Sequence, residues 1–243
     1  MQPMRRSSDQ SITVSVVSHG QRDLIVVLLQ QLANLHNSDI LRVVVTHNLP
    51  DINLEKPVHA GYELVQIHNK KSLGFAANHN RAFAHCATMW YAVLNPDLEF
   101  SYGDPFPALL VEASKDRQLG AIAPALEQPV TKRIEPNRDV VTPIELIRRR
   151  LPGYVPPVEP SWLVGAFLLV RSVAFRAVGG FDDRFKLYCE DVDFGLRIRE
   201  KGWNIRRVET FKVVHLTQRR SHKSIHYTLM HAFSLLRLWL KLF

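Results

Sequence analysis

The chain has 243 residues, of which 46% are hydrophobic and 22% are charged, and it carries a net charge of +8 at pH 7. This composition is that of a globular protein with a sizeable core, and the length suits one large α/β domain or two small ones. Residues 1–11 are polar and lack the apolar segment of a signal peptide. Cys86 and Cys189 are therefore expected to be free thiols in a reducing compartment, which argues against a secreted disulfide framework.

The positive charge is concentrated toward the C-terminus. Residues 197–243 hold 11 lysines and arginines against 2 acidic residues, whereas residues 1–196 hold 20 against 21. A nucleic-acid-binding protein and a protein that sits on an anionic membrane both show such an excess.

Strands and helices are predicted to alternate along the first half of the chain. In chain order they are a strand at 12–18, a helix at 23–35, strands at 41–48 and 62–69, a helix at 74–87, a strand at 89–97, a helix at 103–114 and a strand at 119–126. This alternation predicts an α/β fold with a mostly parallel sheet that helices cover on both faces.

Residues 127–160 interrupt the alternation and hold 7 of the 14 prolines. We expect a flexible surface loop or lid here, because loops of this length are uncommon in compact domains unless they serve a binding site. The regular elements then resume with a strand at 162–170, a short helix at 172–178, a helix from about Asp191 to Gly202, and strands at 203–208 and 211–215.

Residues 225–243 are apolar along most of their length, but Arg237 and Lys241 interrupt them. The segment therefore lacks the roughly 20 uninterrupted apolar residues of a membrane span. His231, Ser234 and these two cations share one helical face by their spacing. A helix that lies in the membrane interface fits this pattern, and a helix docked on the domain's own core is the alternative.

Three carboxylates, Glu190, Asp191 and Asp193, fall within four positions of the segment YCEDVDFGLRIREKGW. They occupy the first turn of the predicted helix, where the helix dipole favours each negative charge by roughly 0.3–1 kcal/mol. An acidic helix start would explain them without any chemistry, so the rest of the chain must decide between that reading and a catalytic one.

Other polar residues lie where ligands usually bind. Asp97 follows a predicted strand in the turn Asn95-Pro96-Asp97, and a carboxylate there suits Mg²⁺ or Mn²⁺ or simply begins the turn. His215 ends another strand and is either a neutral imidazole ligand or a structural histidine. Gly74 opens the helix that carries Asn78 and Asn80, and backbone N–H groups there either meet an anion or are simply capped by polar side chains.

Taken in order, these segments resemble one family. They are VSVVSHG, NKKSLGFAANHNRAF, LNPDLEF, WLVGAFLLVRSVAFRAVGGFDDRFKLYCEDVDFGLRIREKGW and VVHLTQ. Together they are similar to family 2 glycosyltransferases with the GT-A fold, and within these to rhamnosyltransferase-type enzymes of bacterial polysaccharide assembly. The resemblance covers residues 12–216 and implies a Rossmann-like, mostly parallel sheet flanked by helices.

The resemblance also implies a role for each matching position. Asp97 and His215 would hold Mg²⁺ or Mn²⁺ on the donor diphosphate, Asp191 would be the general base of an inverting reaction, and Glu190 would support it or hold the acceptor. The nucleotide sugar would be bound by Ser18, His47, Asn48, Gly74, Asn78, Asn80, Asn95 and Asp97. The acceptor would be bound by Trp162, Gly165 and Glu190.

Two positions depart from the family pattern. Many members carry an aspartate after the second strand, in an Asp-Asn-x-Ser pattern that reads the nucleotide base, whereas this chain has His47 before Asn48. A histidine can hydrogen-bond to a base or stack on it, but the familiar cue for uracil is gone. The first position of the metal motif is Asn95, which supplies no charge.

The sequence thus predicts an inverting, metal-dependent glycosyltransferase that moves a sugar from a nucleotide donor to a glycan or lipid-linked acceptor. Its expected parts are a polar tail at 1–11, a catalytic domain at 12–216 and a basic membrane-associating tail at 217–243. It would work in the cytoplasm on the inner face of an anionic cell membrane, with no nucleic-acid partner. A sugar-nucleotide-forming nucleotidyltransferase and an inactive carbohydrate-binding module are the alternatives.

Overall fold

The computed structural model describes residues 10–35, 39–216 and 225–242, and in the last helix the side chains from residue 228 onward. Its strands are β1 (Ile12–Ser18), β2 (Ile40–His47), β3 (Glu63–His68), β4 (Trp90–Leu94), β5 (Leu98–Glu99), β6 (Leu119–Glu127), β7 (Phe167–Arg171) and β8 (Asn204–His215). Its helices are α1 (Arg22–Ala33), α2 (Phe75–Phe83), α3 (Pro105–Ser114), α4 (Pro143–Arg148), α5 (Ser172–Ala177), α6 (Glu190–Glu200) and α7 (Ile225–Leu242).

The strands form one eight-stranded sheet in the order β3-β2-β1-β4-β7-β6-β8-β5. β1 pairs in parallel with β2 and β4, and β3 continues the parallel half beside β2. β7 runs antiparallel to β4 and β6, while β8 runs parallel to β6 and antiparallel to β5. The expected α/β fold is therefore confirmed, with β7 and β5 as the reversed strands.

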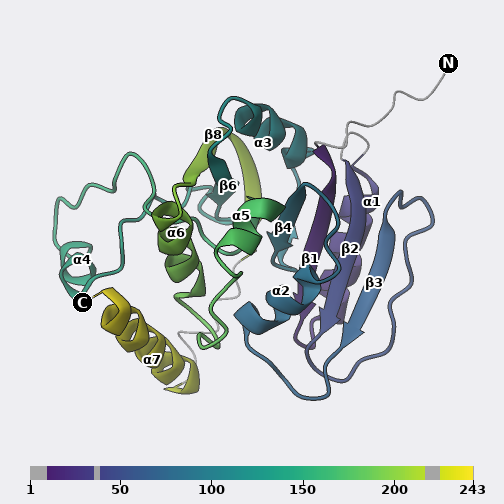
Figure 1. Ribbon diagram of the computed structural model, residues 1–243, viewed down its shortest axis with the longest axis horizontal. Coiled ribbons are helices and arrows are strands. Elements are labelled where there is room, and N and C mark those ends of the chain that lie inside the picture. Colours follow the sequence, from purple (N-terminus) through teal and green to yellow (C-terminus); the bar gives the residue numbers. More distant parts are fainter. Residues whose placement is uncertain (1–9, 36–38, 217–224, 243) are drawn as a thin grey trace.

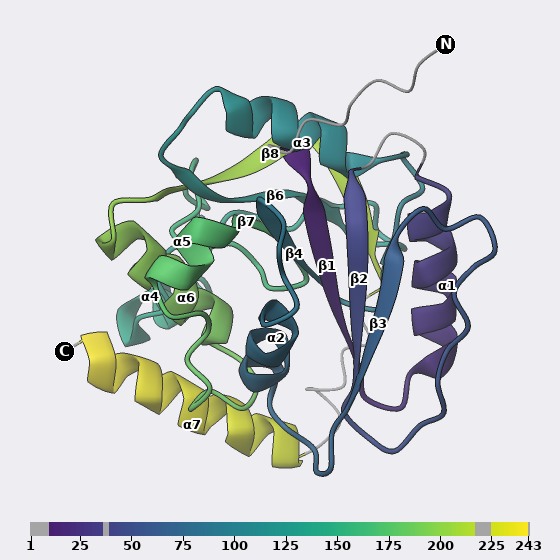
Figure 2. The same ribbon diagram turned by 45° about the vertical axis from the view of Figure 1, so that its right-hand side comes forward.

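Helices cover both faces of the sheet (Figures 1 and 2). The apolar side chains of α1 and α3 join one core cluster with alternate residues of β1 and β4, including Val14, Val16 and Ala92. α2, α5 and α6 share a second cluster with the residues that point the other way, including Tyr91 and Val93. The two-residue period of a strand produces this division, because successive side chains point to opposite faces.

Two strand predictions were wrong in their extent. The predicted strand 162–170 pairs only from Phe167, since Trp162 to Ala166 form a buried but irregular approach to the sheet. The two predicted strands at 203–208 and 211–215 are one strand, β8. Its pairing with β6 shifts between Val208 and Lys212, so an irregularity in the ladder, and not a turn, separates the two apolar halves.

The proline-rich segment 127–160 has internal contacts of its own. It contains α4, whose Thr142 side chain accepts a hydrogen bond from the Glu145 N–H. The buried Glu145 carboxylate accepts hydrogen bonds from Arg149 Nε at 3.0 Å and from the Tyr154 hydroxyl at 2.5 Å. These contacts give the segment a defined shape, and its opening as a lid stays a prediction.

The inner face of α7 packs against the domain, below α6 in Figure 1. Leu238 is buried among apolar side chains of the domain, and Trp239 Nε1 donates to the Val141 carbonyl at 2.7 Å. The outer face exposes large apolar side chains, namely Leu229, Phe233, Leu236 and Leu240. Among the helices of the described residues, none has both the length and the apolar character to cross a bilayer.

Candidate active site

Asp97 and His215 meet at the end of the sheet, as the sequence predicts. The antiparallel pair of β5 and β8 sets Leu98 opposite His215, so the residue before Leu98 is brought beside the histidine. His215 Nε2 lies 3.4 Å from Asp97 Oδ1 and 3.5 Å from Asn95 Nδ2. Asp97 and His215 are largely buried, with 14% and 8% of their side chains exposed.

The chemistry of this pair fits a divalent cation. A carboxylate oxygen and an imidazole nitrogen are both ligands of Mn²⁺, and Mg²⁺ favours the carboxylate. Within the described part of the chain, no three histidine, cysteine or acidic side chains gather as a complete metal cage. A cation held here would therefore take its remaining ligands from water or from the phosphates of a bound nucleotide.

Asn48 and Asn78 organise the loop between β3 and α2. Asn48 Oδ1 accepts hydrogen bonds from the Leu73 N–H and from Asn69 Nδ2, each at 2.8 Å, and its Nδ2 donates to the Leu73 carbonyl at 2.9 Å. Asn78 Oδ1 accepts a second bond from Asn69 Nδ2 at 2.7 Å. Both asparagines are buried, so the structure supports an indirect role in which they hold the loop's shape.

Gly74 and Asn80 connect this loop region to the segment that precedes α6. A Cβ on Gly74 would lie 2.5 Å from the Lys186 carbonyl oxygen, which accepts a hydrogen bond from the Phe75 N–H at 2.9 Å. Asn80 uses both ends of its amide on Phe181, donating to its carbonyl at 2.7 Å and accepting from its N–H at 2.9 Å. These contacts hold the start of α2 against the segment that precedes α6.

His47 and Ser18 end their strands inside the protein. His47 has no exposed surface, its Nε2 lies 3.0 Å from Gln66 Oε1, and its ring stacks on His68 at 4.4 Å between centroids. The expectation that His47 meets a nucleotide base directly therefore conflicts with its burial. His68 is the exposed member of the stack, and no sequence pattern singles it out. The Ser18 side chain is also buried, and its carbonyl accepts the Asn48 N–H at 2.8 Å.

The turn that leads into α6 is strained. Tyr188 and Cys189 have φ angles of 70° and 64°, in the left-handed region. That conformation costs a residue other than glycine roughly 1–2 kcal/mol, and such strain collects at functional sites. The acidic cluster therefore follows a backbone that the surrounding packing must hold in place.

Asp191 and Glu190 differ in their surroundings. The Asp191 carboxylate accepts backbone N–H bonds from Gly165 at 3.0 Å and from Val192 at 2.9 Å. Burial raises the pKa of Asp191, and these two N–H donors oppose that rise. Burial, followed by the charge of Asp191, raises the pKa of Glu190 well above its usual value. Ionised Asp191 beside protonated Glu190 is the charge state that this environment favours.

Asp193 pairs with one cation of its own helix and with one of α7. Its Oδ2 accepts a hydrogen bond from Arg197 Nε at 2.7 Å, and its Oδ1 pairs with the Lys241 ammonium of α7. Asp193 is therefore part of the helix packing.

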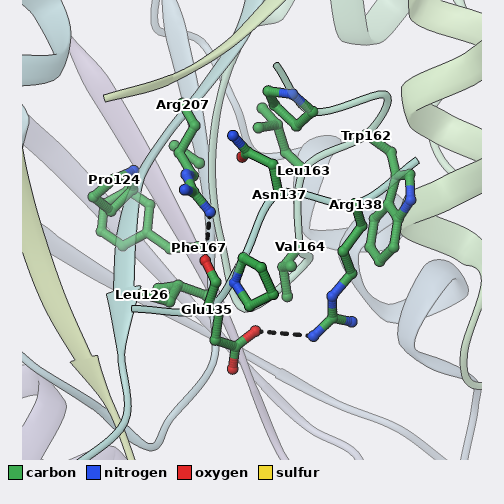
Figure 3. A pocket seen from close by; sticks show the side chains of 13 residues that line it. Pro124, Leu126, Glu135, Asn137, Arg138, Trp162, Leu163, Val164, Phe167 and Arg207 are labelled. Atoms are coloured by element: carbon green, nitrogen blue, oxygen red, sulfur yellow. Dashed lines mark hydrogen bonds and ion pairs between the residues drawn. The ribbon is translucent and has the colours of Figure 1, made fainter. Parts of the chain in front are cut away.

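Of the predicted acceptor residues, Trp162 lines a small pocket together with residues 135–138 of the proline-rich segment (Figure 3), whereas Gly165 and Glu190 are not among the residues that line it. Trp162 is buried, and its Nε1 donates to the Asp139 carbonyl at 3.0 Å. The guanidinium of Arg138 lies 5.6 Å from the centre of the Trp162 ring and pairs with Glu135 at 3.2 Å. Its positive charge also lowers the pKa of Asp191. Sequence reasoning missed Arg138, because only the fold brings the proline-rich segment to α6.

Comparisons of the sequence with known proteins find similar glycosyltransferases. The model of glycosyl transferase family group 2 matches residues 146–240. An N-acetylglucosaminyl-diphospho-decaprenol L-rhamnosyltransferase of Mycobacterium tuberculosis is 32% identical over 59% of this chain, which spans 56% of that relative. The rhamnosyltransferase WbbL of Escherichia coli is 25% identical over 84% of this chain and 83% of its own length. This chain is thus similar to family 2 glycosyltransferases, and it spans about half the length of the first of these relatives.

Solved glycosyltransferase structures share the fold. A mannosyltransferase from Pyrobaculum calidifontis, solved with GDP-Man and Mn²⁺, gives a TM-score of 0.62 at 15% identity over 95% of this chain and 63% of its own. GalNAc-T7, solved with UDP, GalNAc and Mn²⁺, gives a TM-score of 0.61 at 15% identity over 94% of this chain and 47% of its own. These likenesses confirm the GT-A fold of this chain.

Proposed function

We propose that the chain transfers a sugar, with inversion, from a nucleoside diphosphate donor to a hydroxyl group of a lipid-linked or glycan acceptor in cell-surface polysaccharide synthesis. Rhamnose is the sugar that the two named relatives support. The observation that carries the proposal has two parts. Asp97 and His215 meet at one end of the sheet, and Gly165, whose neighbour Ala166 accepts the Asn95 N–H at 2.8 Å, holds the partly buried Asp191 carboxylate at the start of α6.

In this reaction the acceptor hydroxyl oxygen attacks the anomeric carbon of the donor, and its proton passes to a carboxylate oxygen of Asp191. The bond between the anomeric carbon and the diphosphate breaks, and its electron pair leaves with the nucleoside diphosphate. A positioned carboxylate base contributes roughly 10²–10⁴-fold to such a step. The raised pKa of Asp191 makes it a stronger base than an exposed aspartate.

Asp97 and His215 would hold the divalent cation, with Asn95 beside them. When bound, the cation offsets the negative charge that develops on the departing diphosphate. Glu190 is buried and favoured in its protonated form, so it supports the site without adding a second charge beside Asp191.

We further propose that the protein works on the inner face of an anionic membrane. A lipid-linked acceptor resides in a bilayer, and the C-terminal part of the chain carries the positive charge that anionic lipids attract. The outer face of α7 adds exposed apolar side chains, as a helix lying in the interface requires.

A screen of nucleotide sugars by ligand-observed NMR tests the proposal. Donors with uracil, thymine and guanine bases are each mixed with the protein in Mg²⁺, in Mn²⁺ and in chelator. We expect at least one diphosphate sugar to bind in metal and to weaken in chelator, and Asp97→Ala to make the residual binding insensitive to metal. Asp116→Ala, which removes a carboxylate near the far end of β6, is the matched control.

The outcomes separate the parts of the proposal. Donor binding that chelator leaves unchanged would reject the metal role of Asp97 and His215. Failure of every donor to bind, with no transfer to a lipid-linked sugar acceptor, would reject the glycosyltransferase assignment itself.

A further inference from the structure

α7 contacts the segment 182–189, which leads into the proposed catalytic carboxylates. Lys241 Nζ lies 2.7 Å from Asp182 Oδ2 and also pairs with Asp193 of α6. About two turns earlier, the Ser234 hydroxyl donates to the Leu187 carbonyl at 2.8 Å. Contacts from α7 therefore reach the start of this segment, its end, and the helix that follows it.

The segment that α7 contacts includes the strained turn. Tyr188 and Cys189 hold their left-handed conformation immediately before Glu190. Cys189 is the residue that caps α6, and its side chain makes no capping hydrogen bond. The Cys189 carbonyl accepts the Asp193 N–H at 2.9 Å, which joins the turn to the first turn of α6.

α7 supplies part of the surroundings of this turn. Leu238 is 1% exposed and packs in one apolar cluster with Phe185, Cys189 and Val192. The ring of Tyr188 also lies 4.8 Å from the ring of His231 on α7. Loss of α7 would remove the apolar contact of Leu238 with Cys189, and it would remove the Lys241 ammonium that joins Asp182 to Asp193.

We infer that Lys241 is a positioning residue for the proposed catalytic base. Its ammonium joins Asp182 to Asp193 and so fixes the backbone between them, from which Asp191 projects. The inference rests on the proposed function, because it assigns Asp191 the proton transfer. Misplacement of a reacting group by about 1 Å can cost on the order of 10²-fold in rate, so a modest shift of the turn is enough to be measured.

The test compares Lys241→Met with Lys241→Arg and Arg237→Met. Arg237 is a matched control, because it lies over the same Phe185 ring, at 6.0 Å against 5.4 Å for Lys241, and its removal costs the same charge. Turnover is measured on a soluble acceptor, so that membrane binding plays no part. We expect Lys241→Met to lower kcat by about 10- to 100-fold with donor affinity unchanged, Lys241→Arg to restore most of it, and Arg237→Met to stay near the wild type.

Hydrogen exchange gives a readout that does not depend on activity. Lys241→Met should speed exchange of the amides from 185 to 193 while leaving β1 and β4 protected. Unchanged kcat and unchanged exchange in Lys241→Met would overturn the inference. Faster exchange in Lys241→Met, together with a wild-type protein that transfers no sugar, would instead support the contact role of Lys241 and reject the proposed function. A parallel loss of donor affinity and kcat in all three variants would mean that α7 stabilises the fold as a whole and that Lys241 has no specific positioning role.

Discussion

Asp191 and Glu190 are neighbours in sequence, but their environments assign them different charges. Two backbone N–H groups stabilise the Asp191 carboxylate, whereas Glu190 Oε2 is buried with no hydrogen-bond partner among the described residues. Burial with one oxygen left without a donor favours the neutral form of a carboxyl. Protonation of Glu190, which its raised pKa favours, would remove the adjacent like charges that the sequence presents.

The first prediction concerns Asp191→Asn. The amide keeps the size of the side chain but cannot accept the acceptor's proton, so kcat should fall by roughly 10²–10⁴-fold. Donor affinity in the presence of metal should stay the same. The measurement is kcat at saturating donor. Asp193→Asn is the comparison: it removes a charge that pairs with Arg197 and Lys241, so its kcat should fall no further than that of Lys241→Met. Near-native turnover in Asp191→Asn together with its loss in Asp193→Asn would move the base to the other residue.

The second prediction concerns the pH dependence that Glu190 brings to stability. Its folded pKa is raised, so its proton is bound more tightly in the folded protein than in the unfolded chain. The stability is therefore fully present below the unfolded pKa of about 4.3 and declines as pH rises toward the folded pKa.

Glu190→Gln mimics the protonated form and should remove that decline. Its melting temperature at pH 7 should exceed that of the wild type, and the two should converge near pH 4. Turnover should stay within about one order of magnitude, in contrast to Asp191→Asn. Thermal melts across pH 4–8 make the comparison, and a Gln variant that melts lower at every pH would mean that Glu190 is ionised in the folded protein.

How much of the site could be predicted varies by residue. Asp97 and His215 were predictable, because both end apolar strands and such ends converge in an α/β sheet. The burial of His47 was not, because nothing in VVVTHNLPD shows that His68 of the neighbouring strand covers the ring. Arg138 lies in a segment whose pattern predicts only a loop, so its approach to Asp191 depends wholly on tertiary structure.

At the scale of elements, two segments far apart in sequence meet at Gly74. The N-terminus of α2 approaches the segment before α6 so closely that the Phe75 N–H bonds to the Lys186 carbonyl. The φ of Gly74 is −71°, so its backbone would accept any residue, and the need for glycine here is purely one of space.

The third prediction is that Gly74→Ala strains this contact. The added methyl group would meet backbone atoms of Lys186 at 2.5 Å, so one segment must move. Overpacking of this kind costs about 1–3 kcal/mol, and the movement should also lower kcat. Gly61→Ala is the control, because a Cβ there meets nothing within 4 Å. Denaturant melts and kcat of both variants give the answer, and equal stability of the two would show that Lys186 yields freely.

Element boundaries were harder to predict than element types. The break within β8 looks like a turn in sequence, because Glu209 and Thr210 interrupt its apolar pattern. In the structure these residues fall at the ladder irregularity opposite Pro124 and Ala125, where they need no partner on β6. The apolar run 162–166 predicts a strand because it is apolar. In the structure it is buried without pairing as a strand, and a sequence pattern does not separate these two causes of apolar composition.

At the scale of the whole molecule, the two faces of α7 point to different partners. The polar side chains Ser234 and Lys241 face the protein, and the apolar stripe Leu229, Phe233, Leu236 and Leu240 faces outward. Because Leu238 also packs inward, apolar side chains lie on both faces, unlike in an ordinary surface helix. The interpretation of a helix docked on the core holds for the inner face, and the membrane interpretation stays a prediction for the outer face. A second copy of the chain is a poorer partner for the stripe than lipid, since the C-terminal regions of two copies carry like charge.

The last prediction is that the stripe binds an anionic membrane surface. The double variant Phe233→Gln, Leu240→Gln should lower the partition onto vesicles that contain anionic lipid by about 10- to 100-fold, because each large apolar side chain contributes about 1.5–3 kcal/mol when fully buried and an interfacial helix buries only part of it. The melting temperature should not change, since the two side chains are 70% and 77% exposed.

The matched control is Val155→Gln, Val158→Gln, which removes two side chains that are 80% and 93% exposed on the proline-rich segment. It should co-sediment with the vesicles as the wild type does. Binding by the wild type should weaken in high salt, because salt screens the attraction between the basic segment and the lipid headgroups. Wild-type protein that ignores anionic vesicles would reject the membrane surface. A stripe variant that instead turns a dimer into a monomer would assign the face to a second copy of the chain.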